Sequence, residues 1–251
     1  MTDRDKLLLA KTEDLFRLCD KYAEPRFSQF LDGAEAAYIE DNFHFPYGFN
    51  TMLFGGFPDS ERKILGVFPE WTDAEEGLFP VSVIKISGGY DRRLTHRDYL
   101  GTILSLGIDR AKTGDIIIGE DGFAYAAVTE DIAEYIAGNL KKIANCGVKT
   151  ELLSSTESIN PVRRIEKISA VCASMRADAV VGALTGLSRS AAAKLVTAEK
   201  VKINHRLVID VSKTVHEGDL ISVRGYGRYI INEESGKTRS GRLHIAAGKY
   251  V

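Results

Sequence analysis

The amino-acid sequence predicts an α+β protein built from several small domains. Its 251 residues exceed what one ordinary domain needs, helical and strand-like periodicities alternate along the chain, and the charge is unevenly distributed. We expect three modules: a small α+β domain at residues 1–75, a βαββαβ domain at 76–160 and a compact helix–helix–sheet domain at 167–251.

The first module begins with an amphipathic helix pattern over residues 7–22, which Pro25 ends. A second helix is expected over 32–42. Two short strand-like runs follow, at 50–54 and 63–68. This mixture predicts a small α+β unit.

The middle module has a clear order of elements. We expect a strand at 79–87, a helix at 95–106, strands at 115–119 and 123–128, a helix at about 130–143 and a strand at 148–153. This β-α-β-β-α-β order is the split βαβ plan, which ferredoxin-like domains and the RNA recognition motif share.

Phe123 and Tyr125 stand on the third strand of this module, one residue apart, so their rings share one face of the sheet. In an RNA recognition motif such rings stack on unpaired bases. However, Asp121 occupies the place of a basic residue. Base stacking and packing against a neighbouring domain therefore both stay open for these rings.

The charge of the chain is polarised. Residues 163–251 hold 16 Lys and Arg against 8 Asp and Glu, whereas residues 1–162 hold 17 against 27. A basic module carried by an acidic body predicts binding to a polyanion. Membrane insertion and secretion are not expected, because no apolar run approaches 18 residues and the first residues lack a signal-peptide pattern.

The basic module should begin with a strand at 168–173, followed by two short helices. Gly186 separates the two helices, and Ser188 caps the second helix, which runs to about Lys200. In the first helix, small residues such as Gly182 would let a backbone come close. Strands are expected at 201–204, 207–211 and 218–224. The candidate RNA-binding residues are the cations Arg176, Arg189, Lys194, Lys200, Lys202, Arg206, Arg224 and Arg228, together with Asp178, Ser188, Ser190 and Asn204, which the family resemblance given below implies. Arg176 and Arg189 are the foremost of these, since helix N-termini favour phosphate.

Several motifs of this module, in order and with matching spacing, resemble the S4 RNA-binding domain. They are Ser174-Met-Arg-x-Asp178, Ser188-Arg-Ser-x-Ala-x-x-Leu195, Val201-x-Ile-Asn204 and Gly218-Asp-x-Ile-Ser-Val-Arg-Gly-Tyr-Gly-Arg-Tyr229. One departure is Glu199-Lys200, where S4 domains usually have a Gly before the strand, so the turn is expected to be less tight.

With Thr95-His-Arg-Asp-Tyr-Leu-Gly101 and Gly55-Gly-Phe-Pro-x-x-Glu-Arg62, the resemblance extends over nearly the whole chain to the YlmH family of bacterial S4-domain proteins. It implies an N-terminal domain, an RRM-like middle domain and an S4 domain. It also implies binding to 23S ribosomal RNA or tRNA on the large ribosomal subunit, in quality control of stalled peptidyl-tRNA complexes with C-terminal alanine tailing. The family is also labelled a cell-division factor.

Other chemistry finds little support in the sequence. The three cysteines, Cys19, Cys146 and Cys172, lie far apart in the sequence, which disfavours disulfides and a thiolate zinc site. Cysteines used in this way indicate a protein of the reducing cytoplasm. The five His residues also lack the spacing of metal ligands. We expect no cofactor, no metal, no DNA and no catalytic residue. The rival classes are an S4-type RNA-modifying enzyme such as a pseudouridine synthase, with Asp98 and Asp109 as nominal candidates, and a cell-division adaptor with incidental RNA affinity.

Overall fold

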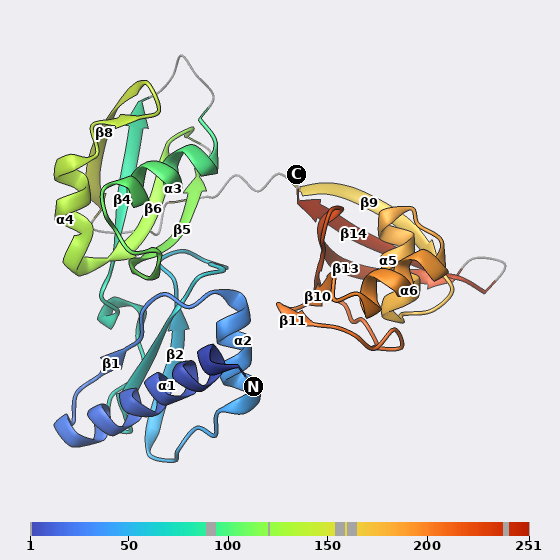
Figure 1. The fold of residues 1–251 in the computed structure, drawn as a ribbon, viewed down its shortest axis with the longest axis horizontal. Coiled ribbons are helices and arrows are strands. Elements are labelled where there is room, and N and C mark those ends of the chain that lie inside the picture. Colours follow the sequence, from blue (N-terminus) through green and yellow to red (C-terminus); the bar gives the residue numbers. More distant parts are fainter. Residues whose placement is uncertain are drawn as a thin grey trace. The chain divides into compact units, whose positions relative to one another are not determined.

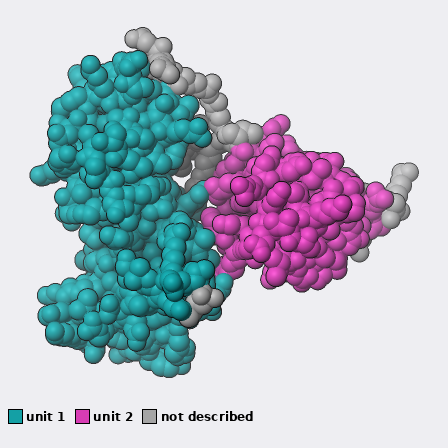
Figure 2. Space-filling view, viewed as in Figure 1, with its two compact units in different colours: residues 1–162 teal, residues 163–251 magenta. Residues whose placement is uncertain are grey.

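Helices and strands of the chain fall into two groups (Figure 1). The computed structural model describes residues 2–88, 94–119, 121–153, 159, 165–237 and 241–250. Unit 1 comprises residues 1–162 and unit 2 comprises residues 163–251, coloured teal and magenta in Figure 2. The multidomain α+β class is confirmed, whereas the boundary expected at residue 75 lies inside unit 1.

The N-terminal part of unit 1 is a three-stranded antiparallel sheet with two helices. Its elements are α1 (Asp3–Tyr22), β1 (Arg26–Phe27), α2 (Gly33–Asn42), β2 (Phe49–Phe54) and β3 (Ile64–Pro69), with the strands in the order β1-β3-β2. Both helices begin with a capping box, at Thr2 and at Asp32, which satisfies N–H groups that the first turn leaves free. The predicted helices and strands of residues 1–75 are all present.

Strand β3 is buried along its whole length, because its two faces pack against different layers. Leu65 and Val67 lie in one cluster with residues of α1 and α2. Ile64 and Phe68 point to the other face and pack with residues of a second, five-stranded sheet. The two parts of unit 1 therefore share a hydrophobic core.

The second sheet of unit 1 has the split βαβ topology. It is built from β4 (Val81–Gly88), α3 (His96–Ser105), β5 (Thr113–Ile118), β6 (Ala124–Thr129), α4 (Glu130–Asn139), β7 (Lys142–Ile143) and β8 (Cys146–Leu153), with strand order β5-β6-β4-β8-β7. The first strand of the motif, β4, lies between the third and the last, as this plan requires.

One helix of this module is shorter than predicted. Helix α4 ends at Asn139, not near Ile143. Leu140 leaves the helix in an extended conformation and is buried, and Ile143 pairs with Cys146 in a short hairpin that buries Ile143 in the same core. Burial of these two apolar side chains therefore requires the chain to turn where the periodicity predicted continued helix.

Helices α3 and α4 cover one face of the five-stranded sheet (Figure 1). The other face packs on the N-terminal part of the unit, with Tyr125 and Ala127 in the shared core. The approach is close at Gly114, where a Cβ atom would lie 2.6 Å from Cε1 of Phe30. Only glycine fits there without displacing the ring.

Unit 2 packs two helices on one face of a six-stranded antiparallel sheet. Its elements are β9 (Ile165–Cys172), α5 (Ala177–Thr185), α6 (Arg189–Thr197), β10 (Val201–Ile203), β11 (Arg206–Leu207), β12 (Leu220–Val223), β13 (Gly227–Lys237) and β14 (Leu243–Tyr250), in the order β11-β10-β12-β13-β14-β9. Apolar side chains from both helices and from the inner sheet face form one core. The long strands β13 and β14 were not predicted, and the strand expected at 207–211 is only Arg206–Leu207.

Helix α6 ends three residues before the predicted Lys200. The N–H of Lys200 donates to the carbonyl of Leu195 at 3.0 Å, and the N–H of Glu199 donates to that of Val196 at 3.1 Å. These are the two bonds of a Schellman motif, and Glu199 adopts the left-handed conformation, with φ of 58°, that such a motif requires. The expectation of a looser turn is therefore wrong, since glutamate takes the glycine conformation.

Candidate nucleic-acid interface

The starts of the two helices of unit 2 carry the first group of predicted residues. Arg176 is the N-cap residue of α5, and Ser188 is that of α6, where its Oγ accepts a hydrogen bond from the N–H of Ala191 at 3.2 Å. Between them, Gly186 ends α5 with φ of 71°, and the N–H of Leu187 donates to the carbonyl of Gly182. This turn places Arg189 beside the beginning of α5.

Asp178 connects the two arginines. Its Oδ2 accepts from Nε of Arg189 at 2.9 Å, and its Oδ1 accepts from Nε of Arg176 at 3.2 Å. Asp178 is 5% exposed, and this burial alone would raise the pKa of its carboxyl. The hydrogen bonds from Arg189 and Arg176 outweigh that effect, so the pKa lies below its usual value. Three predicted residues thus form one cluster with a net charge of about +1.

The two arginines of this cluster keep contact with solvent. Their side chains are 55% exposed for Arg189 and 38% for Arg176. A guanidinium has five N–H donors, and Asp178 uses one or two of them on each arginine. The carboxylate therefore orients both cations while further donors remain for a phosphate.

A second group of predicted cations surrounds a hollow of ≈ 530 Å³ on the same unit. Four of them line it, namely Lys200, Lys202, Arg224 and Arg228. Lys202 lies opposite Ser222, which lies opposite Arg228, so these side chains project from one face of strands β10, β12 and β13. Their neighbours Val201 and Val223 point into the core. Sheet alternation therefore concentrates the cations on the outer face.

The remaining predicted residues of unit 2 fall into two kinds. Lys194 is exposed on α6, and the hydroxyl of Ser190 lies 3.1 Å from that of Ser188. Arg206 is half-buried on β11. In contrast, Asn204 uses both ends of its amide within the protein. Its Nδ2 donates to Asp219 at 2.7 Å, and its Oδ1 accepts from the N–H of Leu220 at 2.9 Å.

Asn204 therefore has a structural role. Asn204 and His205 have φ of 49° and 66°, and they form the two-residue turn between β10 and β11. Its amide thus holds the turn in place, and the prediction of Asn204 as an RNA contact stays a prediction.

Of the aromatic pair in the middle module, Tyr125 has the packing role that the sequence left open. Tyr125 is 5% exposed in the core shared by both parts of unit 1, and its hydroxyl donates to Asp121. Burial, together with this bond, raises the pKa of Tyr125 to about 12. Base stacking is therefore corrected for Tyr125, because the sheet face that an RNA recognition motif leaves open is covered. Phe123 is half-buried, with Nζ of Lys85 at 4.4 Å from its ring centroid.

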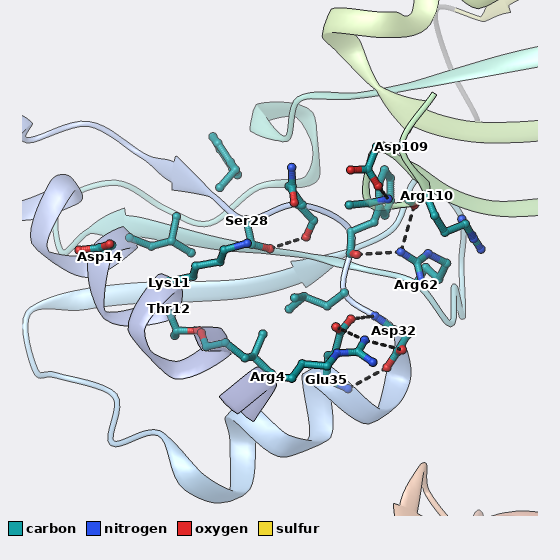
Figure 3. Close-up of a pocket in the computed structure, with 17 residues that line it drawn as sticks. Arg4, Lys11, Thr12, Asp14, Ser28, Asp32, Glu35, Arg62, Asp109 and Arg110 are labelled. Atoms are coloured by element: carbon teal, nitrogen blue, oxygen red, sulfur yellow. Dashed lines mark hydrogen bonds and ion pairs between the residues drawn. The ribbon is translucent and has the colours of Figure 1, made fainter. Parts of the chain in front are cut away.

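A second hollow, of ≈ 650 Å³, lies in unit 1 beside α1 and has cations on its walls (Figure 3). Its guanidinium groups are engaged by the protein. Arg4 donates to Glu35 at 2.7 Å, and Arg62 and Arg110 both donate to the carbonyl of Thr113, at 3.0 and 2.5 Å. Of these contacts, the one between Arg62 and Thr113 joins the two parts of unit 1. The geometry favours a structural role for this hollow.

Sequence reasoning missed Tyr226, which lines the hollow of unit 2 and is 38% exposed. Gly225 and Gly227 flank it with φ of 88° and 120°. An aromatic residue between two glycines after a strand is the sequence signal that could have identified it, since such a turn holds a ring away from the core.

Among the described residues, none of the helices is both long and apolar enough for a membrane span. The described part of the chain also contains no cluster of three or more His, Cys, Asp or Glu side chains suited to a metal ion.

The fold of unit 2 and its clustered cations define an RNA-binding protein of the S4-domain class. Residues 175–221 match the family model of the S4 domain, and residues 75–157 match that described as "Putative RNA-binding domain in YlmH". The chain is 31% identical over 193 residues to the ribosome-associated protein quality control protein P2 of Bacillus subtilis, covering 76% of this chain and 74% of the relative. The chain belongs to the YlmH family.

A solved structure has a similar fold. The cell division protein ylmH from Streptococcus pneumoniae superposes with a TM-score of 0.51, at 23% sequence identity, over 64% of this chain and 97% of that one. The fold likeness agrees with the family assignment.

Proposed function

We propose that this protein binds ribosomal RNA or tRNA on the large ribosomal subunit through unit 2. In this proposal it is a non-catalytic factor in the quality control of stalled peptidyl-tRNA complexes that receive alanine tails. The observation that carries the proposal is the pair of cationic groups on unit 2, the Arg176–Asp178–Arg189 cluster and the hollow lined by Lys200, Lys202, Arg224 and Arg228. The name of the Bacillus relative supports the ribosomal setting.

The physical basis is phosphate recognition. RNA helices expose phosphates and 2′-hydroxyls while their base edges are hard to reach, so a protein grips them with Arg and Lys. In unit 2, a carboxylate orients two guanidinium groups, and a sheet face presents four more cations. In this proposal the protein acts by positioning, since it holds an RNA-bearing subunit in one geometry while another factor performs the chemistry.

Co-sedimentation with isolated 30S and 50S subunits tests the proposal. The expected result is pelleting with 50S alone, strong at about 50 mM salt and weak at about 200 mM. Because Arg189→Ala alone would leave Asp178 with one partner fewer, the test variant is the double substitution Asp178→Asn/Arg189→Ala. Lys142→Ala, which removes an exposed charge from unit 1, is the control.

The double variant should lose most of its 50S pelleting, and Lys142→Ala should keep it. Equal loss in both would contradict the assigned surface. No pelleting of the wild type with either subunit would reject the proposal, in favour of an enzyme acting on free RNA or a division adaptor.

A further inference from the structure

The hollow on the outer sheet face of unit 2 combines cations with an aromatic ring. Tyr226 lies on its wall together with Lys200, Lys202, Arg224 and Arg228, and Glu199 is the one acid among the lining residues. Like charges that face one space repel one another unless an anion binds between them. The hollow is therefore suited to an anionic ligand that also has a flat face.

The walls of the hollow are held by backbone hydrogen bonds. The N–H of Arg224 donates to the carbonyl of Lys200 at 2.9 Å, which fixes the distance between two opposite walls. The N–H of Tyr226 donates to the carbonyl of Val223 at 3.0 Å, and the buried hydroxyl of Tyr229 donates to the carbonyl of Tyr226 at 3.1 Å. The turn is thus ordered before any ligand arrives, and the Tyr226 ring contributes nothing to these bonds.

The size of the hollow restricts its occupant. Its ≈ 530 Å³ falls in the range of about 300–1,000 Å³ that holds one small ligand, and no double helix fits in such a space. Lys202 and Arg228 are separated by one strand, or about 10 Å. Aromatic rings beside cations are the recurring means by which proteins hold unpaired bases.

We infer that this hollow binds one unpaired nucleotide of RNA, with its base stacked on Tyr226 and its phosphates held by Lys200 and Arg224. The inference rests on the proposed RNA-binding function and names the RNA feature that unit 2 recognises. In this inference the Arg176–Asp178–Arg189 cluster binds paired RNA through its phosphates, and the hollow distinguishes a bulged or looped RNA from a continuous duplex.

The test uses the full-length chain and two RNA hairpins with the same stem, one fully paired and one with a single unpaired 4-thiouridine. The wild type should bind the bulged hairpin about tenfold more tightly, the preference expected from one stacked base. Irradiation should cross-link the 4-thiouridine to the peptide that contains Tyr226. Tyr226→Ala should remove the preference and the cross-link, whereas Tyr226→Phe should keep the preference.

Tyr47→Ala, which removes a tyrosine that is 95% exposed in unit 1, is the matched control. Equal affinity of the wild type for both hairpins, or a cross-link that maps to another part of the chain, would overturn the inference. If 50S pelleting persists in that case, the proposed function stands and the nucleotide pocket alone is rejected. If the wild type binds neither hairpin and neither subunit, both proposals fall.

Discussion

At the scale of single residues, two acids decide how unit 2 presents its cations. Asp178 is buried and holds the guanidinium groups of Arg176 and Arg189 within hydrogen-bonding distance. Glu199 occupies a left-handed position at the end of α6, next to the cation Lys200. Neither acid would stand out in a count of charges, yet we expect both to change the free energy of unfolding of unit 2.

The free energy of unfolding of unit 2 should decrease in acid because of Asp178. The pKa of its carboxyl lies below the ordinary value of 3.8 in the folded protein. The ionised group therefore stabilises the fold above pH 3.8, and this contribution is lost as the pH falls through the folded-state pKa. Hydrogen exchange of the α5 amides between about pH 5 and pH 2.5 would measure this loss.

Asp178→Asn should flatten this pH dependence, because asparagine does not titrate. Glu217→Gln, at an exposed acid of the same unit, is the control and should leave the profile as in the wild type. A profile of Asp178→Asn that matches the wild type would show that another acid is responsible.

Glu199→Gly should raise the free energy of unfolding by about 1 kcal/mol. An L-residue in the left-handed region carries a steric cost that glycine avoids, and Glu199 has φ of 58°. Urea unfolding followed by circular dichroism would measure the difference. Glu199→Ala is the control, since alanine keeps the Cβ atom and should gain little. A stability gain of the same size in Glu199→Ala would show that the side chain, not the backbone, carries the cost.

At the scale of elements, the close packing of α5 and α6 brings the two arginines together. A Cβ atom at Gly182 would lie 3.1 Å from the carbonyl oxygen of Leu187 and 3.6 Å from Cβ of Ala192. The expectation that small residues on α5 let a backbone approach is therefore confirmed. Ala179 is also buried in the core of unit 2, and seven of the nine residues of α5 are buried.

Gly182→Val should lower the free energy of unfolding of unit 2 by about 1–3 kcal/mol, because a larger side chain forces the two helices apart. It should also weaken RNA binding, since Arg189 moves with α6. The matched control is Gly138→Val in α4, where a Cβ atom meets no other atom within 4 Å. Circular dichroism melting and hairpin affinity would separate the two effects. Unchanged stability of Gly182→Val would contradict the close packing.

At the scale of the whole chain, the charge is divided between the two units. Unit 2 has 16 Lys and Arg against 8 Asp and Glu, whereas unit 1 has 17 against 27. The net negative charge of unit 1 disfavours a polyanion, whereas the net positive charge of unit 2 attracts a phosphate backbone. The affinity of the full chain for RNA should therefore depend steeply on salt.

If about five phosphates are neutralised, the logarithm of the binding constant should fall with the logarithm of salt concentration at a slope of roughly −3.5 to −4.5. Binding of the full-length chain to an RNA hairpin, measured at several salt concentrations, would give this slope. Lys200→Ala and Arg224→Ala should each reduce its magnitude by about 0.7–0.9, and Lys142→Ala should not. A slope near zero would rule out an electrostatic interface.

The sequence predicted much of the secondary structure because most segments follow local rules. Thr95 and Asp98 form the cap that begins α3, and Gly186 ends α5 as its conformational freedom allows. Errors arose where a distant contact outweighed the local pattern. Helix α4 stops at Asn139 so that Ile143 reaches the core, and the ends of β13 and β14 are set by their long ladder.

The sequence by itself determined the α+β class, the split βαβ order, the S4 motifs and the concentration of positive charge in the last 89 residues, because periodicity, caps and charge are local properties of the chain. Only the tertiary structure decided what individual side chains do. It buried Tyr125 between two sheets, joined Arg176 and Arg189 through Asp178, and placed Tyr226 among four cations. Each of those roles depends on at least one residue from another element, which packing brings into contact.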